Sequence, residues 1–184
     1  MHPHLKEILF DEATIQAKVA EMAAEISRDY AGKKVLVVGI LTGAVMFAVD
    51  LLKRLTIDVE LDFMDVSSYG ASLSSSGEVR ILKDLSSAAE GREILIVEDI
   101  IDTGNTLVYL KRILNERLAR SVKIAALLDK PAGRKVEIEA DYVGFVVPDA
   151  FIVGYGIDYA QRYRQLPYIG IFNTDFMIKE EQNE

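Results

Sequence analysis

The sequence predicts an α/β fold in which a mostly parallel, twisted sheet is flanked by helices. Between residues 35 and 130, short apolar runs typical of buried strands alternate with amphipathic patterns typical of helices. Two of these runs lead through a small glycine-containing turn directly into a helical pattern. No linker long enough to separate two domains interrupts the chain. We therefore expect residues 1–184 to form a single domain, with a small C-terminal hood mainly from about residues 145–184.

The composition is that of a soluble globular protein. Half of the 184 residues are hydrophobic and 27% are charged. The absence of cysteine excludes disulfides and thiolate metal sites. The chain does not start like a signal peptide and has no apolar run of membrane-spanning length, so we expect a cytoplasmic protein with no membrane partner. The net charge of −8 argues against nucleic acid as the main partner, because nucleic-acid binding requires a basic face.

The first elements follow from hydrophobic periodicity. An apolar stripe predicts an amphipathic helix over residues 11–30, with Gly32 as its C-terminal stop. Residues 35–38 predict a buried strand, which leads through the turn at 39–44 into a second helix. Hydrophobic and acidic residues alternate over 57–63, as in a half-exposed strand.

A Gly- and Ser-rich stretch at residues 67–77 predicts either a plain flexible loop or a lid that closes over a site and excludes water. The remaining apolar runs read as short strands. They lie at residues 79–82, 94–97, 123–128, 142–147 and 169–172.

The stretch 94–106 is the most informative part of the chain. A buried strand is followed by the acids Glu98 and Asp99, a third acid at Asp102, a small polar turn at 103–106, and a helical pattern that extends to Leu118. We therefore predict a strand, an acidic loop, a tight turn and a helix.

This arrangement has a chemical meaning. A Thr- and Gly-containing turn at a helix N-terminus offers backbone N–H groups and hydroxyls to a phosphate. Carboxylates so close by would repel that phosphate unless they faced sugar hydroxyls or a Mg²⁺ on a second phosphate. On spacing alone, an ordinary turn with solvated acids remains an alternative.

The whole stretch 94–106 resembles the phosphoribosyl pyrophosphate signature of the type I phosphoribosyltransferases. The resemblance covers about residues 35–172 and is closest to the bacterial hypoxanthine (hypoxanthine-guanine) phosphoribosyltransferases. It implies transfer of a phosphoribosyl group from phosphoribosyl pyrophosphate to hypoxanthine, and to guanine as well, with Mg²⁺ as cofactor. It also implies small-molecule substrates and a homodimer or homotetramer.

The resemblance assigns roles to the acids and the turn. Asp102 would be the general base that takes the purine N7 proton. Glu98 and Asp99 would face the ribose hydroxyls and serve as metal ligands. The phosphoribosyl and 5′-phosphate set comprises Glu98, Asp99, Asp102, Thr103, Gly104, Asn105 and Thr106.

The turn Leu41-Thr42-Gly43 resembles the pyrophosphate loop of the family, whose first peptide bond is often cis. Some relatives have a lysine at the position of Thr42, so backbone groups would carry the contact here. Without the resemblance, a plain strand-to-helix connection would be the preferred interpretation. Ser68 and Tyr69 of the flexible stretch, together with Arg164, would complete the pyrophosphate site.

A base pocket is implied by residues after two later strands. Lys130 would donate to the 6-oxygen of a purine, which selects a 6-oxo over a 6-amino base. Phe151 would stack on the base and Ile152 would meet its edge through the main chain. Asp158 would lie beside the base and near Mg²⁺, through water. The alternatives are an exposed lysine and a purely structural apolar segment.

Two functional alternatives remain. One is a phosphoribosyltransferase that prefers xanthine, because Lys130 and Phe151 disfavour adenine and pyrimidines but hardly separate the 6-oxopurines. The other is a regulator that senses phosphoribosyl pyrophosphate and binds nucleic acid. The acidic charge and the presence of Asp102 argue against this regulator.

Overall fold

The computed structural model describes residues 1–68 and 79–176. A six-stranded sheet of order β4-β3-β2-β5-β6-β7 forms the body of the molecule. Its pairs are parallel except for β3 with β4, which confirms the predicted fold class. The strands are β2 (Lys34–Leu41), β3 (Asp58–Ser68), β4 (Val79–Lys83), β5 (Glu93–Ile101), β6 (Ser121–Asp129) and β7 (Tyr142–Val146).

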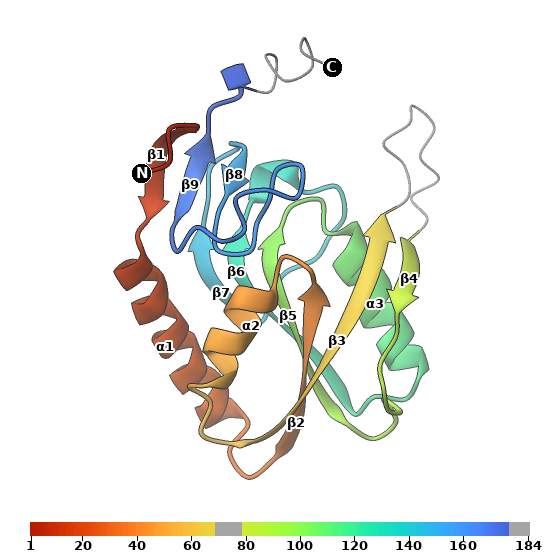
Figure 1. The fold of residues 1–184 in the computed structure, drawn as a ribbon. Coiled ribbons are helices and arrows are strands. Elements are labelled where there is room, and N and C mark those ends of the chain that lie inside the picture. The colour runs from red at the N-terminus through yellow and green to blue at the C-terminus, as the bar shows by residue number, and fades with distance from the viewer. Residues whose placement is uncertain (69–78, 177–184) are drawn as a thin grey trace.

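Helices cover both faces of this sheet (Figure 1). α1 (Glu12–Asp29) and α2 (Val45–Leu52) share one hydrophobic cluster, and α3 (Asn105–Glu116) belongs to the other. In β5, Leu95 faces the first cluster and Ile96 the second, and both are fully buried. A strand covered on both faces has no polar side, which explains its unbroken apolar sequence.

The first helix has the predicted boundaries. The Asp11 side chain caps it by accepting a hydrogen bond from the backbone N–H of Thr14 at 2.8 Å. The helix ends at Asp29 with Tyr30 as its C-cap, and Gly32 follows with φ of 75°, a conformation that suits glycine.

A second, three-stranded sheet forms the hood, in the order β1-β9-β8. Figure 1 shows it at the upper left, above α1 and on the side of the view away from β3 and β4. The hydrophobic pattern predicts β9 but not β1, whose antiparallel partner β9 lies near the other end of the chain. The hood strands are β1 (Leu5–Phe10), β8 (Ile152–Val153) and β9 (Ile169–Phe172).

Two details of the central element differ from the prediction. β5 continues to Ile101, so Glu98 and Asp99 are strand residues and the prediction of an acidic loop was wrong. The reason is that pairing with β6 persists beyond the apolar run, with Glu98 opposite Ala126. Leu118 was also wrongly placed in the helix, since α3 ends at Glu116 and Leu118 is 66% exposed with φ of 60°.

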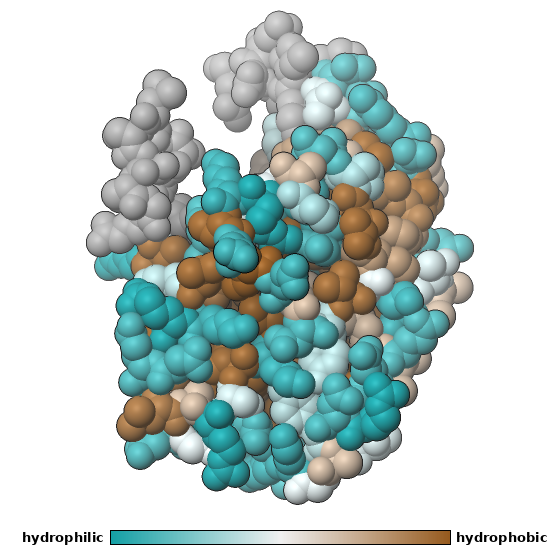
Figure 2. All heavy atoms as spheres, turned by 180° about the vertical axis from the view of Figure 1, so that it is seen from behind, coloured by the Kyte–Doolittle hydropathy of each residue, from teal (hydrophilic) through white to brown (hydrophobic). Residues whose placement is uncertain are grey.

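The face shown in Figure 2 mixes hydrophilic residues with hydrophobic areas between them. Among the described residues, no helix combines the length and the apolar character needed to cross a membrane. Most of the Gly- and Ser-rich stretch at 67–77 lies outside the described residues.

Candidate active site

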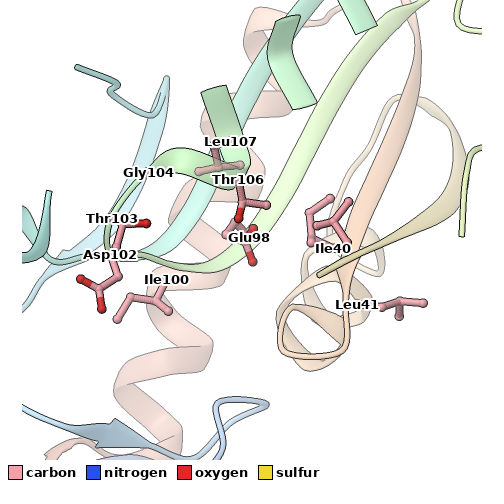
Figure 3. A pocket seen from close by; sticks show the side chains of 10 residues that line it. Ile40, Leu41, Glu98, Ile100, Asp102, Thr103, Gly104, Thr106 and Leu107 are labelled. Atoms are coloured by element: carbon pink, nitrogen blue, oxygen red, sulfur yellow. The ribbon is translucent and has the colours of Figure 1, made fainter. Parts of the chain in front are cut away.

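The predicted site residues converge at one edge of the sheet. β2, β5 and β6 are adjacent and parallel, so the turns after them meet at their carboxyl ends, where ligands bind in open α/β sheets. A pocket of about 240 Å³ lies there, between the end of β2 and the turn from β5 to α3 (Figure 3). Its lining residues are Ile40, Leu41, Val66, Glu98, Ile100, Asp102, Thr103, Gly104, Thr106 and Leu107.

The turn between β5 and α3 has the features of an anion site. Gly104 adopts a left-handed conformation with φ of 84°, and α3 begins at Asn105 without a side-chain cap. Free N–H groups in the first turn of a helix attract phosphate. The Thr103 and Thr106 side chains line the same pocket and add two hydroxyls. The predicted phosphate residues therefore lie together.

The two adjacent acids are held close to one another. Glu98 is only 9% exposed, and its Oε1 accepts a hydrogen bond from the backbone N–H of Asp99 at 3.3 Å. Burial raises the pKa of Glu98 well above its usual range, and the negative charge of Asp99 raises it further. Burial also raises the pKa of Asp99. Two acids in this setting favour a cation or hydroxyl donors as partners.

Asp99 connects this turn to the one after β2. A Cβ atom added to Gly43 would overlap Oδ2 of Asp99 and would lie 2.7 Å from its Cγ, so the carboxyl group lies directly against the glycine. The peptide bond between Leu41 and Thr42 is cis, as the resemblance implied. Figure 3 shows Glu98 between this end of β2 and the turn that carries Thr106.

The hood also reaches the β2 turn. A Cβ atom at Gly156 would overlap the carbonyl oxygen of Gly43, so the two backbones are in close contact. Arg164 donates to the carbonyl oxygen of Gly156 at 2.7 Å and pairs with Asp158 at 2.8 Å. Two residues predicted for pyrophosphate and metal are thus brought beside the predicted pyrophosphate turn.

Of the two remaining pyrophosphate candidates, Ser68 lies on β3. Ser68 is the last residue of this strand, which runs beside β2 and pairs Asp65 with Leu41. Tyr69 lies outside the described residues.

The predicted base-reading residues form a third group. The Lys130 ammonium lies 2.9 Å from Oδ2 of Asp102 and 3.7 Å from Oδ1 of Asp149. The Lys130 side chain is only 14% exposed, so it is not the exposed surface lysine of the alternative interpretation. Phe151 is 40% exposed and makes edge contacts with neighbouring rings, whereas Ile152 is buried in β8.

Three further residues of this region, Gly133, Arg134 and Lys135, were not predicted. A Cβ atom on Gly133 would overlap Oδ1 of Asp102. Arg134 pairs with Asp129, and the next residue, Lys135, donates its backbone N–H to the carbonyl oxygen of Thr103 at 3.0 Å. The Pro-Ala-Gly sequence after Lys130 signals a turn, but no local pattern indicates what that turn contacts.

A metal ion at this site would need coordinating atoms from a bound substrate as well as from the protein. Within residues 1–68 and 79–176, no cluster of three or more His, Cys, Asp or Glu side chains is arranged to enclose a metal ion. Mg²⁺ commonly uses one or two carboxylates together with substrate phosphates. The neighbouring carboxyl groups of Glu98 and Asp99 fit that mode.

A doubly covered, mostly parallel sheet with an uncapped helix N-terminus and a hood at its carboxyl edge forms a site suited to a phosphorylated ligand. A model of the family described as the phosphoribosyl transferase domain matches residues 6–160. The chain therefore belongs to the phosphoribosyltransferase family, which confirms the resemblance found in residues 94–106.

The individual relatives of the chain have more specific names than the family model. The chain is 56% identical over 171 residues to the hypoxanthine-guanine phosphoribosyltransferase of Bacillus subtilis, covering 93% of this chain and 95% of that one. It is 57% identical over 175 residues to the bifunctional protein TilS/HprT of Listeria monocytogenes, which covers 95% of this chain but only 27% of that longer protein. A crystal structure of a hypoxanthine phosphoribosyltransferase from Staphylococcus aureus matches with a TM-score of 0.92 and 49% identity, over 96% of each chain.

Proposed function

We propose that this protein is a purine-salvage enzyme that transfers the 5-phosphoribosyl group from phosphoribosyl pyrophosphate to hypoxanthine and guanine. The observation that carries the proposal is the meeting of three groups at one sheet edge. These are the anion-binding turn at 103–106, the acids Glu98 and Asp99, and the pair of Lys130 with Asp102. A ligand with a phosphate, a diol and a purine would use all three.

In the proposed reaction, N9 of the purine forms a bond to the anomeric carbon while the bond from that carbon to pyrophosphate breaks. The turn at 103–106 binds the 5′-phosphate through backbone N–H groups and hydroxyls. Glu98 and Asp99 accept hydrogen bonds from the ribose hydroxyls. Asp102 accepts the N7 proton, because N7 becomes acidic as N9 bonds to carbon.

Base selection falls to Lys130, Phe151 and Ile152. An ammonium group can donate but not accept a hydrogen bond, so Lys130 favours a 6-oxo over a 6-amino purine. The exposed ring of Phe151 offers a stacking surface. The Ile152 main chain would contact the base edge, with Asp158 close by.

Leaving-group binding falls to Leu41, Thr42, Gly43, Ser68, Tyr69 and Arg164. The Arg164 guanidinium supplies the positive charge, since Thr42 is neutral. Mg²⁺ would be held by Glu98, Asp99 and, through water, Asp158. When bound, it would stabilise the negative charge that develops on pyrophosphate.

The experiment that tests the function measures pyrophosphate release from phosphoribosyl pyrophosphate and Mg²⁺ with six bases. The panel comprises hypoxanthine, guanine, xanthine, adenine, uracil and orotate. We expect fast release with hypoxanthine and guanine. Fastest release with xanthine would correct the substrate, and release with none of the six would refute the enzyme. The Lys130→Ala variant should lose activity with hypoxanthine, whereas unchanged kinetics would remove Lys130 from base recognition.

The regulator alternative receives no support from the named relatives, which are transferases. It is tested by retention on heparin at moderate salt, which a nucleic-acid-binding regulator should show and this acidic chain should not. We also propose a cytoplasmic homodimer or homotetramer. Light scattering of the purified protein would give its oligomeric state.

A further inference from the structure

The two charged groups proposed to recognise the purine contact each other. The Lys130 ammonium donates to the Asp102 carboxylate at 2.9 Å. The purine needs an N–H of Lys130 for its 6-oxygen and an oxygen of Asp102 for its N7 proton. The ion pair therefore engages both side chains that the base must recruit, and it holds them towards each other rather than towards the base.

Resting on the function proposed above, we propose that Gly133 is a positioning residue that sets the affinity for the purine. Because glycine has no side chain, the space beside it is open, and Asp102 pairs with Lys130 in that space. The Asp102 carboxyl group occupies the volume that any side chain at position 133 would fill. A Cβ atom there would overlap its Oδ1, and would lie 2.9 Å from its Cγ and 3.1 Å from Cε of Lys130.

The requirement for glycine is one of space rather than of backbone conformation. Gly133 is not among the glycines with positive φ, so alanine could adopt its backbone angles without strain. It ends the short 3₁₀ helix η1 (Pro131–Gly133), which directly follows Lys130. An alanine would therefore act mainly through its contact with Asp102.

The backbone around Gly133 is less free to move than the carboxylate. The N–H of Gly133 donates to the carbonyl oxygen of Lys130 at 3.1 Å. The N–H of Arg134 donates to the carbonyl oxygen of Pro131 at 3.1 Å. The Arg134 side chain is tied to Asp129. The Asp102 side chain is 46% exposed, and Lys130 is its ion-pair partner among the described residues. A methyl group at position 133 should therefore turn Asp102 outward and separate it from Lys130.

Separating the pair should make the purine bind more tightly. A ligand that must first displace an internal contact binds more weakly by the stability of that contact. A partly exposed ion pair of this kind corresponds to about a two- to fivefold change in affinity. The turnover number should not change, because in the complex with the purine the wild-type Asp102 has already left Lys130 for the N7 proton.

The decisive experiment compares steady-state kinetics of the wild type, Gly133→Ala and the control Ala132→Ser. Ala132 is an exposed neighbour in the same 3₁₀ helix. We expect Gly133→Ala to lower KM for hypoxanthine about two- to fivefold, with unchanged kcat and unchanged KM for phosphoribosyl pyrophosphate. Ala132→Ser should change none of these values. In the Asp102→Ala background, Gly133→Ala should not alter binding of the product nucleotide.

Lower turnover or a higher KM for hypoxanthine in Gly133→Ala would overturn the proposal, since Gly133 would then hold Asp102 in its working position. Crystal structures supply a readout that does not depend on activity. The Lys130 and Asp102 side chains should be in contact in the wild type and apart in Gly133→Ala. A wild-type crystal structure without the pair would refute the proposal, even if the variant does not fold. Failure of every base in the panel would instead refute the proposed function.

Discussion

The turns after β2 and β5 are built alike but contribute differently to the site. Each connects a buried parallel strand to a helix and contains one glycine. Gly104, in the turn after β5, has a left-handed backbone with φ of 84°. Gly43, in the turn after β2, leaves room for the carboxyl group of Asp99. Gly104 is therefore required by the backbone conformation of its own turn, whereas Gly43 is required by the space that Asp99 of the neighbouring strand occupies.

The charges are also divided unequally between the two units. The end of β5 and its turn carry Glu98, Asp99 and Asp102, whereas the β2 turn at 41–44 carries no charged residue. The β5 unit therefore carries the ionisable groups, whereas the β2 turn is in close contact through Gly43 with Asp99 and Gly156. Substitutions in the two turns should therefore have different effects on turnover and on stability.

The largest effect is expected from neutralising the proposed base. Asp102→Asn should lower kcat by about 10²- to 10⁴-fold, the range that general-base catalysis contributes. KM for phosphoribosyl pyrophosphate should change much less, because the turn at 103–106 is retained. Steady-state kinetics with hypoxanthine would measure kcat and this KM. Full turnover in a correctly folded variant would exclude Asp102 from the mechanism.

The next effect is expected in the uncharged turn. Gly43→Ala should destabilise the fold by about 1–3 kcal/mol, because its Cβ atom would overlap Asp99 in a tightly packed place. Denaturant unfolding measures this change. Adding Asp99→Ala should restore part of the lost stability. If the double variant is no more stable than Gly43→Ala alone, the space argument for Gly43 is wrong.

The matching change in the charged turn should behave differently. Gly104→Ala should cost about 1–2 kcal/mol of stability, because a residue with a Cβ atom is strained at positive φ. The Cβ atom would also lie 2.6 Å from Cγ2 of Ile138. Shortening that neighbour with Ile138→Ala should not restore stability, since the backbone strain remains. Full recovery of stability would mean that Gly104, like Gly43, is required for space rather than for its backbone conformation.

The smallest effect is expected from Glu98→Gln, and it should be stabilising at neutral pH. Burial and Asp99 raise the pKa of Glu98 in the folded state, so folding favours the protonated acid. Glu98 therefore contributes most to stability below the ordinary pKa of glutamate, and its contribution is lost as pH rises towards the raised value. Glutamine removes that loss, and each kcal/mol regained raises Tm by about 2–4 °C. Calorimetry at pH 5 and pH 7.5 should show a smaller difference in the variant than in the wild type.

The strand–turn–helix units could be predicted because their signals are local. The apolar run 94–97 and the turn at 103–106 contain most of the information about β5 and the start of α3. The extension of β5 through Glu98 could not be predicted, because it depends on pairing with Ala126 of another strand. The roles assigned to individual site residues remain predictions.

The contacts between distant residues could not be predicted from local patterns. The pair of Lys130 with Asp102 and the fit of Gly133 against the same carboxylate depend on the adjacent parallel strands β5 and β6. β1 was missed for a similar reason, since its partner β9 lies at residues 169–172. Only the three-dimensional arrangement brings these residues together.

The pairing of β1 with β9 has a consequence for the order of events during synthesis. The six strands of the main sheet all lie before residue 147, whereas β1 must wait for residues 169–172. As the chain emerges from the ribosome, the main sheet can form first, and the hood closes last. The contact of Gly156 with Gly43 is then also made late. We therefore expect a nascent chain to gain a folded main sheet before the hood contacts the turn after β2.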